Sequence, residues 1–229
     1  MDPDRLAALR RRYDRLPMLE GELGPDPFAA FGQWFADAVT DAEEGLLVEA
    51  NAVILATVDA DGRPSARTVL LKAFDPRGFV VYTNYTSAKA QDVDGNPNVA
   101  LVFPWHPLDR QVRVTGRAEK VSREETEAYF RTRPWSSRIG AWASHQSSVL
   151  PDRSALEDRF AELAHRWPEG SDVPVPDFWG GLRVVPDSVE FWQGRPDRLH
   201  DRLRFSRELA PVGDPGEHPG AWVLERLAP

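Results

Sequence analysis

A predicted β-hairpin gathers hydroxyl groups and cations at its ends. The β-rich runs 67–72 and 79–84 are joined by a Pro/Gly turn at 75–78, a pattern that predicts a hairpin. The polar side chains at its ends and exit are Arg67, Thr68, Lys72, Thr83, Ser87 and Lys89. Hydroxyls and cations that converge beside an apolar strand suit a phosphate attached to a flat aromatic ring. The alternative is an ordinary amphipathic hairpin with charged ends.

Lysine is rare in this chain, and its placement favours the phosphate interpretation. The sequence has 25 arginines and only three lysines, Lys72, Lys89 and Lys120. Two of these three lysines lie in the hairpin and its exit. Because a compact ammonium and a planar guanidinium are not interchangeable, a lysine in an arginine-rich sequence indicates a place that needs the ammonium.

Tyr129, Arg133 and Ser137 form a second polar group. Intervals of four place them on one side of a helix, or of a helix–proline–helix corner around Pro134. Two hydroxyls and a guanidinium make a phosphate-binding set. A solvated helix face would show the same spacing, so the spacing alone leaves both interpretations open.

A third group combines an aromatic ring with cations near the C-terminus. Trp192 precedes a turn at 194–197, and Arg198, His200 and Arg202 follow that turn. On a strand the last three residues would share one face, because side chains alternate with a period of two. A polar edge strand would look the same, although two arginines that flank a histidine repel each other.

The last candidate group carries amides. Gln111 falls on a predicted strand, and Gln146 and Ser147 fall in a loop. Amide and hydroxyl groups can recognise the polar edge of a ring, and equally any other polar ligand.

Composition and missing motifs narrow the chemistry. The 229 residues carry a net charge of −8, which argues against a general nucleic-acid binder because no overall basic field exists. Without cysteine there is no thiolate nucleophile, disulfide or cysteine-bound metal, and the five histidines lack metal-ligand spacing. G-x-G-x-x-G, Walker A and H-E-x-x-H motifs are absent from the sequence. A bound organic cofactor is therefore favoured over a metal.

The sequence contains no targeting signal that we recognise. The first residues, Met1-Asp2-Pro3-Asp4-Arg5, are polar and acidic, and no apolar run approaches membrane-spanning length. We therefore expect a cytoplasmic protein that does not bind membranes.

Helical and strand patterns alternate along the chain in a characteristic order. Helices are predicted at 6–16, from 27 with Asp26 as its N-cap, at 87–94, 122–130, after 134 and at 154–167. Strands are predicted at 52–58, 67–72, 79–84, 99–105, 110–121, 179–185, 188–193, 198–205 and 222–227. Successive strands interrupted by helices favour a mainly β fold, a β-barrel with helical decoration, over a parallel doubly wound sheet.

Together the polar groups and their flanking residues resemble the pyridoxamine 5'-phosphate oxidase family, the FMN-dependent enzymes that make pyridoxal 5'-phosphate. The matching stretches run in order over nearly the whole chain. They include Arg67-Thr68-Val69-Leu70-Leu71-Lys72, Tyr82-Thr83-Asn84, Phe103-Pro104-Trp105-His106, Arg110-Gln111-Val112, Ile139-Gly140-Ala141-Trp142, Phe178-Trp179-Gly180-Gly181, Glu190-Phe191-Trp192-Gln193-Gly194, Arg198-Leu199-His200-Asp201-Arg202 and Glu225-Arg226-Leu227-Ala228-Pro229.

The resemblance implies a fold, a cofactor and a reaction. The fold is an FMN-binding split β-barrel that forms one domain over 1–229, as a homodimer with two FMN sites at the subunit interface. Hydride would pass from C4' of pyridoxamine or pyridoxine 5'-phosphate to the flavin N5, and dioxygen would reoxidise the flavin and give hydrogen peroxide. FMN carries the redox chemistry, and the protein supplies positioning and electrostatics.

The resemblance also assigns residues. FMN contacts fall on Arg67, Thr68, Val69, Leu70, Leu71, Lys72, Tyr82, Thr83, Lys89, Gln111, Gln146, Ser147, Trp192 and Arg202. The substrate phosphate meets Lys72, Tyr129, Arg133 and Ser137, while Arg198 and His200 lie over the pyridine ring near the carbon that is oxidised. Residues 1–25 resemble a mobile N-terminal lid, with Arg10, Arg11, Arg12 and Tyr13 as its substrate-facing part.

One position departs from the family pattern. The family usually has Arg-Lys after the serine, whereas this chain reads Ser87-Ala88-Lys89. One cation for the FMN phosphate is therefore absent, and we expect a change in FMN affinity.

Two alternatives remain at this point. The first is a related split-barrel flavin oxidase that acts on another ring system, such as a phenazine precursor; the four phosphate-facing residues argue against it. The second is a protein that binds FMN or pyridoxal phosphate without turnover, against which Arg198 and His200 argue.

Overall fold

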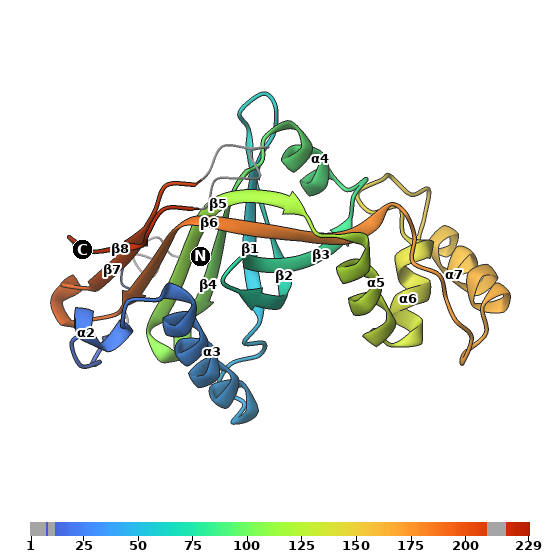
Figure 1. The fold of residues 1–229 in the computed structure, drawn as a ribbon. Helices are drawn as coiled ribbons and strands as arrows, with labels where there is room; N and C mark the ends of the chain where they lie inside the picture. The colour runs from blue at the N-terminus through green and yellow to red at the C-terminus, as the bar shows by residue number, and fades with distance from the viewer. Residues whose placement is uncertain (1–7, 9–11, 210–218) are drawn as a thin grey trace. The chain divides into compact units, whose positions relative to one another are not determined.

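The computed structural model describes residue 8, residues 12–209 and residues 219–229, and these are mainly β-strands (Figure 1). The strands are β1 (Ala52–Val58), β2 (Pro64–Asp75), β3 (Gly78–Asn84), β4 (Asn98–Trp105), β5 (Arg110–Lys120), β6 (Trp179–Gln193), β7 (Asp201–Ser206) and β8 (Val223–Leu227). The helices are α2 (Glu20–Leu23), α3 (Pro27–Glu43), α4 (Ala88–Gly95), α5 (Arg123–Thr132), α6 (Trp135–Ala143) and α7 (Ser154–Arg166), with short 3-10 turns at His106–Leu108 and Pro196–Arg198.

Six of the strands close into a barrel. The hydrogen-bonded order is β3-β2-β1-β4-β5-β6-β7-β8, and an additional antiparallel pairing of β3 with β6 joins the two sides of the six-stranded part. Strands β7 and β8 extend the sheet beyond β6. Closure removes the exposed edges that an open six-stranded sheet would present. The mainly β fold with helical decoration is thus confirmed.

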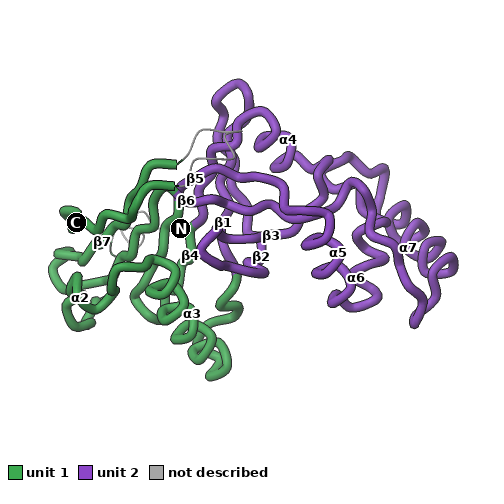
Figure 2. Tube along the Cα trace, in the orientation of Figure 1, with its two compact units in different colours: residues 1–51, 102–114, 187–229 green, residues 52–101, 115–186 purple. Residues whose placement is uncertain are grey.

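The chain divides into two compact units (Figure 2). Unit 1 contains Met1–Asn51, Val102–Val114 and Asp187–Pro229, and unit 2 contains Ala52–Leu101 and Thr115–Pro186. Strands β4, β5 and β6 contribute residues to both units. The expectation of one domain over 1–229 stays a prediction.

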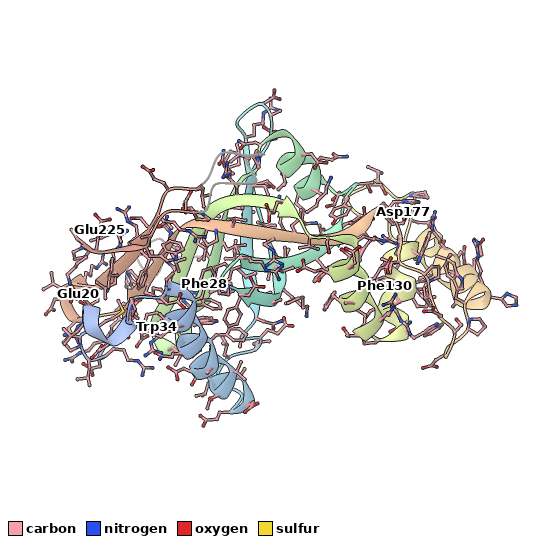
Figure 3. The ribbon with its side chains drawn as sticks, in the orientation of Figure 1. Glu20, Phe28, Trp34, Phe130, Asp177 and Glu225 are labelled. Atoms are coloured by element: carbon pink, nitrogen blue, oxygen red, sulfur yellow. The ribbon has the colours of Figure 1, made fainter. Side chains whose placement is uncertain are left out.

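Unit 1 is built around α3, as the aromatic spacing predicts. Asp26 accepts a hydrogen bond from the Phe28 N–H at 3.0 Å, and Pro27 occupies the first turn. Phe28 and Trp34 project from α3 (Figure 3), and the fully buried Phe31 packs edge-on against Phe103 at 5.0 Å between ring centroids.

Unit 2 has its own core of barrel strands and the helices α4 to α7. Alternate residues of β1 are buried, as expected for a strand with one face inward. At the other side of the unit, Phe130, Ile139 and Trp179 form the centre of a second hydrophobic cluster between α5, α6 and α7. Ser122 caps α5 by accepting from the Glu125 N–H at 3.1 Å, as the sequence predicts.

Three predicted strands differ in the structure: 179–185 and 188–193 form one strand, and 198–205 begins later. Strand β6 is continuous through Pro186, where the sequence suggests a break. The reason is that residues 179–184 pair with β3 and residues 188–193 pair with β7, so the proline falls between the two ladders. The predicted strand 198–205 begins only at Asp201, because Asp197 and Arg198 have left-handed backbone conformations with φ of 57° and 63°.

The predicted helix 6–16 is only partly supported: Ala8 is helical, whereas the later part of the range is not. Arg12 to Leu16 are not helical, while residues 6, 7 and 9–11 lie outside the described part of the chain. The short helix α2 follows, inside the segment 1–25 that resembles a lid. No helix among the described residues is long and apolar enough to cross a membrane.

Candidate functional site

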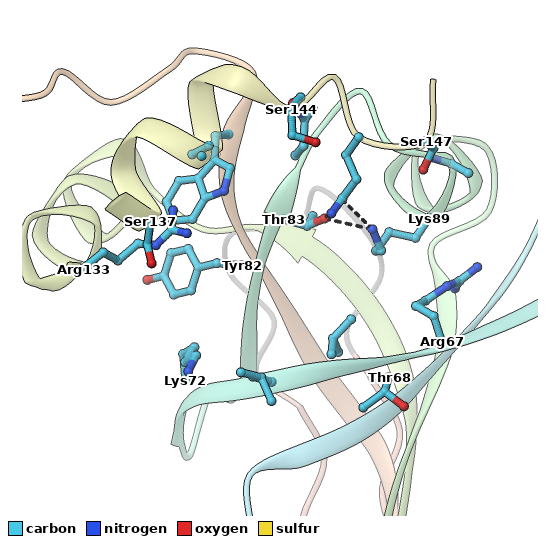
Figure 4. A pocket seen from close by; sticks show the side chains of 18 of the residues that line it. Arg67, Thr68, Lys72, Tyr82, Thr83, Lys89, Arg133, Ser137, Ser144 and Ser147 are labelled. Atoms are coloured by element: carbon cyan, nitrogen blue, oxygen red, sulfur yellow. Dashed lines mark hydrogen bonds between the residues drawn. The ribbon is translucent and has the colours of Figure 1, made fainter. Parts of the chain in front are cut away.

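A pocket of about 800 Å³ lies within unit 2 and collects most of the predicted site residues (Figure 4). Those that line it are Arg67, Thr68, Val69, Leu70, Lys72, Tyr82, Thr83, Lys89, Tyr129, Arg133, Ser137, Gln146 and Ser147. They come from β2, β3, α4, α5, α6 and the loop after α6. The hairpin and the Tyr129–Ser137 group, which the sequence leaves as separate hypotheses, are therefore parts of one site.

Figure 4 shows the polar side chains in two groups. We call the first the Lys89 end; it contains Arg67, Thr83, Ser87, Lys89, Gln146 and Ser147. We call the second the Arg133 end; it contains Lys72, Tyr82, Tyr129, Arg133, Ser137 and Trp179.

At the Lys89 end a buried ammonium is held by neutral oxygens. Lys89 Nζ donates to Gln146 Oε1 at 2.7 Å, to Thr83 Oγ1 at 3.2 Å and to Ser87 Oγ at 3.3 Å. Burial lowers the pKa of Lys89 and the nearby charge of Arg67 lowers it further, while Asp92 acts in the opposite direction. A buried cation whose three hydrogen-bond partners are all neutral is suited to receive an anion.

Arg67 lies on β2 beside this cluster. Its guanidinium donates to Thr57 Oγ1 at 2.7 Å and lies 3.8 Å from the carboxylate of Asp92. Burial lowers its pKa, while Asp92 acts in the opposite direction. The side chain is thus held in place by groups outside the pocket before any ligand binds.

The position of Ala88 is exposed, although Ser87 and Lys89 on either side are buried. Its backbone N–H donates to Ser147 Oγ at 3.2 Å, and Ser147 has a left-handed φ of 73°. A hydrogen bond therefore joins the first turn of α4 to the loop after α6. The side chain of Ala88 is a methyl group, so this position carries no positive charge.

Strand β2 presents Lys72 by means of a bulge. Leu71 pairs with Val81 and Ala73 with Val80, so Lys72 is the extra residue of the strand. Such a bulge turns a side chain out of the regular alternation, and Lys72 is exposed at the pocket. Leu71, predicted as an FMN contact, is 4% exposed and does not line the pocket.

At the Arg133 end three aromatic rings lie nearly parallel. Tyr82 stacks on Tyr129 at 3.9 Å and on Trp179 at 5.3 Å between centroids. The Arg133 guanidinium lies 4.6 Å from the centroid of the Trp179 ring. Burial raises the pKa of Tyr82 to about 12, so its hydroxyl stays protonated and can donate.

Arg133 carries an unsatisfied donor in this stack. Its Nη1 is buried and has no hydrogen-bond partner among the described residues. Burial lowers the pKa of Arg133, which means that the buried charge is not compensated locally. An anion bound at this end would supply both the missing acceptor and the missing charge.

Trp179 is a pocket residue that the residue-by-residue assignment omits. The sequence points to Trp179 only through the stretch Phe178-Trp179-Gly180-Gly181, which resembles the family but carries no predicted role. Gly181 explains part of that stretch, because a Cβ there would come within 3.1 Å of the Tyr82 ring.

Gln111, Trp192, Arg198, His200 and Arg202 belong to unit 1 and do not line the pocket. Because β7 begins at Asp201, Arg198 and His200 precede the strand, and the expectation that they share a strand face with Arg202 is wrong.

Unit 1 has its own cluster of rings around His200. The His200 ring lies 4.7 Å from Trp192 and 5.4 Å from Tyr13 between centroids. Tyr13 also packs against Gly194, where a Cβ would approach its ring to 2.5 Å. We call these residues the His200 cluster; they bring together part of the predicted lid and part of the predicted ring-binding group.

The orientation of His200 is fixed by the backbone. Its Nδ1 accepts from the Arg195 N–H at 3.1 Å, so the proton of the neutral ring is on Nε2. Burial lowers the pKa of His200, and the charge of Arg198 lowers it further. Arg202 is paired with Glu190 at 2.9 Å. Of the other predicted lid residues, Arg12 is exposed, and Arg10 and Arg11 lie outside the described residues.

The donor sets of the pocket fit a ligand that combines a phosphate with a flat ring. The Lys89 end offers a buried ammonium and hydroxyls, and the Arg133 end offers an orphaned guanidinium donor beside stacked aromatic rings. No group of three or more His, Cys, Asp or Glu that could hold a metal ion occurs within the described ranges. The site therefore suits an organic cofactor such as FMN together with a phosphorylated substrate.

Comparison with known proteins gives a consistent picture. The family described as "Pyridoxamine 5'-phosphate oxidase" matches residues 39–167, and the "Pyridoxine 5'-phosphate oxidase C-terminal dimerisation region" matches residues 179–229. A pyridoxine/pyridoxamine 5'-phosphate oxidase of Frankia casuarinae is 53% identical over 97% of this chain and 94% of its own length. The corresponding protein of Streptomyces avermitilis is 52% identical over 97% of this chain and 96% of its own length.

Among solved structures, PhzG from Burkholderia lata superposes with a TM-score of 0.80. It is 28% identical, and the alignment covers 96% of this chain and 100% of PhzG, which was solved in complex with tetrahydrophenazine-1-carboxylic acid. An FMN-binding protein of Nostoc punctiforme shares the fold. It superposes with a TM-score of 0.64, is 21% identical, and the alignment covers 86% of this chain and 96% of its own.

Proposed function

The chain belongs to the pyridoxamine 5'-phosphate oxidase family, and we propose that it oxidises pyridoxamine 5'-phosphate and pyridoxine 5'-phosphate to pyridoxal 5'-phosphate. It is an FMN-dependent oxidoreductase. The observation that carries the proposal is the pocket of unit 2, in which cations at the Lys89 end and at the Arg133 end offer places for two phosphates.

The Lys89 end would hold the FMN phosphate. Lys89, Arg67 and the Ser147 hydroxyl would supply donors there. The Thr83 hydroxyl donates to Gln146 Oε1, which accepts from Lys89 and orients the ammonium. FMN held there would supply the redox chemistry, as hydride acceptor toward C4' of the substrate and as electron donor toward dioxygen, which would give hydrogen peroxide. For pyridoxamine 5'-phosphate, formation of the aldehyde would also take up water and release ammonia. Since Lys89 is hydrogen-bonded in advance, little side-chain reorganisation accompanies binding.

The Arg133 end would hold the substrate phosphate. Arg133 and Lys72 supply positive charge, and Tyr129 and Ser137 supply hydroxyl donors. The orphaned Nη1 of Arg133 gains its acceptor when the phosphate arrives. A charge-assisted hydrogen bond of this kind contributes about 1.5–3 kcal/mol. This end therefore selects phosphorylated substrates over their unphosphorylated forms.

Arg198 and His200 would position the pyridine ring of the substrate. His200 presents Nε2–H, because its Nδ1 accepts from the backbone of Arg195. Trp192 and Arg202 would contact FMN. The C-terminal residues 179–229 match a dimerisation region, and we propose a homodimer in which two FMN sites are completed at the subunit interface.

A second candidate function is the oxidation of another ring system, which the structural similarity to PhzG suggests. The ligand in that structure carries a carboxylate and no phosphate. The Arg133 end offers two cations, Lys72 and Arg133, and the hydroxyls of Tyr129 and Ser137. A single carboxylate would not use this many hydrogen-bond donors, whereas a phosphate can. The B6 phosphates are therefore the better match.

The proposal is tested by purifying the protein, recording its flavin spectrum and measuring its mass in solution. Peroxide formation is then assayed with pyridoxine 5'-phosphate, with pyridoxamine 5'-phosphate and with a carboxylated tricyclic ring. We expect a yellow homodimer with about one FMN per chain and turnover of the phosphates, by the family assignment. A colourless monomer that does not take up added FMN, or turnover of the tricyclic ring alone, would contradict the proposal.

A further inference from the structure

We propose that an ionic network outside the pocket, formed by Asp75, Arg77, Glu125 and Arg183, sets the geometry of the substrate-phosphate site at the Arg133 end. This inference rests on the proposed function. None of the four residues lines the pocket, so they are positioning residues that act through the elements they join.

Arg183 is the centre of the network. Its side chain is only 5% exposed, and it donates from Nη2 to both oxygens of Glu125 at 3.1 and 3.0 Å. Its Nη1 donates to Asp75 Oδ1 at 3.1 Å. Arg77 joins the same two carboxylates, at 2.7 Å to Asp75 and 2.8 Å to Glu125. Two arginines and two carboxylates thus form a closed, neutral ring of ion pairs.

The network joins three elements that carry pocket residues. Asp75 ends β2 three residues after Lys72, and Arg183 on β6 pairs across the ladder with Val80 of β3. Glu125 lies in the first turn of α5, one turn before Tyr129. The Glu125 carbonyl also accepts from the Tyr82 hydroxyl at 3.3 Å. The ion pairs therefore connect the strand that presents Lys72 to the helix that presents Tyr129 and ends at Arg133.

The bulge in β2 makes such a connection necessary. Lys72 is the extra residue between Leu71 and Ala73, so the ladder with β3 does not fix its position as it fixes its neighbours. Asp75 anchors the strand on the far side of the bulge. Because a binding site must hold its groups within about 0.5 Å of the productive geometry, this anchor determines whether Lys72 and Arg133 reach the same ligand.

The burial of Arg183 supports a geometric role over a purely stabilising one. A buried ion pair gains little net stability, because desolvation of the charges offsets their attraction. Burial opposes ionisation of Glu125, but hydrogen bonds from Arg77 and Arg183 outweigh it and lower the pKa of Glu125. The pKa of Asp75 is lowered in the same way. Both carboxylates stay charged at neutral pH, and the network keeps its directional bonds.

The test replaces one carboxylate by its neutral isostere. Glu125→Gln keeps the size of the side chain and removes its charge. We expect KM for pyridoxine 5'-phosphate to rise about five- to tenfold, because displaced donors bind the substrate phosphate less well. We expect kcat and FMN affinity each to change less than about twofold, because the proposed site of the FMN phosphate is the Lys89 end.

The matched control is Glu127→Gln. Glu127 lies on the same helix and forms exposed ion pairs with Arg123 and Arg131. We expect it to change neither KM nor FMN affinity, since exposed pairs of this kind contribute about 0–1 kcal/mol. Asp75→Asn is a second probe of the network, in case Glu125→Gln does not fold, and should raise KM in the same direction.

The outcomes distinguish a failure of the network inference from a failure of the proposed function. An active wild type with equal KM in Glu125→Gln, Asp75→Asn and Glu127→Gln would overturn the network inference and leave the proposed function standing. Parallel loss of FMN affinity and substrate affinity in the network variants would also overturn it, because it would show general destabilisation. A wild type inactive with both B6 phosphates would overturn the proposed function, and this inference with it.

Discussion

The pocket of unit 2 and the His200 cluster of unit 1 differ in how their cations are neutralised. In the pocket, Lys89 bonds to three neutral oxygens, and Arg133 has a buried donor without a described partner. In unit 1, Arg202 is paired with Glu190, and Arg195 lies 3.5 Å from Asp201. Buried donors such as those of Lys89 and Arg133 favour anions, whereas the rings packed around His200 favour contact with a flat ring. This difference supports the proposal that the pocket binds the phosphates and that the His200 cluster contacts the ring.

The largest expected effect tests the ring side of this comparison. Arg198→Ala and His200→Ala should each reduce kcat/KM by about a hundredfold, because a misplaced substrate loses the alignment needed for hydride transfer. FMN should stay bound, since neither residue is assigned to the flavin phosphate. Steady-state kinetics and the flavin content of each variant provide the measurement. Near-wild-type kcat/KM in both variants would remove the His200 cluster from the site.

The next effect tests the pocket. Arg133→Ala should mainly raise KM for phosphorylated substrate, by about tenfold or more, because it loses a charge-assisted bond worth about 1.5–3 kcal/mol. Lys72→Ala should raise KM in the same direction but less, because Lys72 is exposed. Arg131→Ala is the control, since Arg131 lies on the same helix but forms an exposed pair with Glu127. If the control raised KM as much as Arg133→Ala, the effect would reflect general surface charge and not specific binding of the substrate phosphate by Arg133.

A smaller effect is expected at the family departure, Ala88. Since the position is exposed, Ala88→Arg should tighten FMN binding by about two- to tenfold, with a steeper salt dependence. Titration of both apoproteins with FMN at low and high salt measures this change. Equal dissociation constants at both ionic strengths would mean that Arg67 or another cation already fills the role.

The smallest effect concerns the titration of His200. Burial is the larger cause that lowers the pKa of His200, and the charge of Arg198 is the smaller one. The ring is therefore mostly neutral at pH 6.5, about the ordinary histidine pKa, and gains its proton at lower pH. Activity that needs neutral His200 should therefore persist below pH 6.5 and fall only on further acidification. In Arg198→Ala the His200 pKa should move upward, as followed by NMR of the imidazole. A wild-type pKa above the ordinary value would contradict this assignment.

Local patterns in the sequence predicted much of the pocket. The Pro/Gly turn placed the β2–β3 hairpin, and intervals of four placed Tyr129, Arg133 and Ser137 along one side of the α5–α6 corner. Both patterns are periodic and local, so they can be read from one chain. The convergence of the two groups on one pocket depends on tertiary contacts, which no spacing encodes; only the family resemblance anticipated it.

The parts that the sequence missed have identifiable physical causes. The left-handed conformations at Asp197 and Arg198 shortened the predicted strand, and neither residue type demands that conformation. The bulge at Lys72 and the stacking of Trp179 under Arg133 depend on strand register and on packing between distant segments. The ion pairs of Arg183 also join residues far apart in the chain, from Asp75 to Glu125.

One comparison of substrates tests the central claim most directly, that the Arg133 end recognises the phosphate of a B6 substrate. Peroxide formation is measured for pyridoxine 5'-phosphate and for unphosphorylated pyridoxine, with the wild type and with Arg133→Ala. We predict that the wild type prefers the phosphate by at least on the order of a hundredfold in kcat/KM, and that Arg133→Ala narrows this preference by about tenfold or more. Equal use of both substrates by the wild type, or an unchanged preference in Arg133→Ala, would contradict the claim.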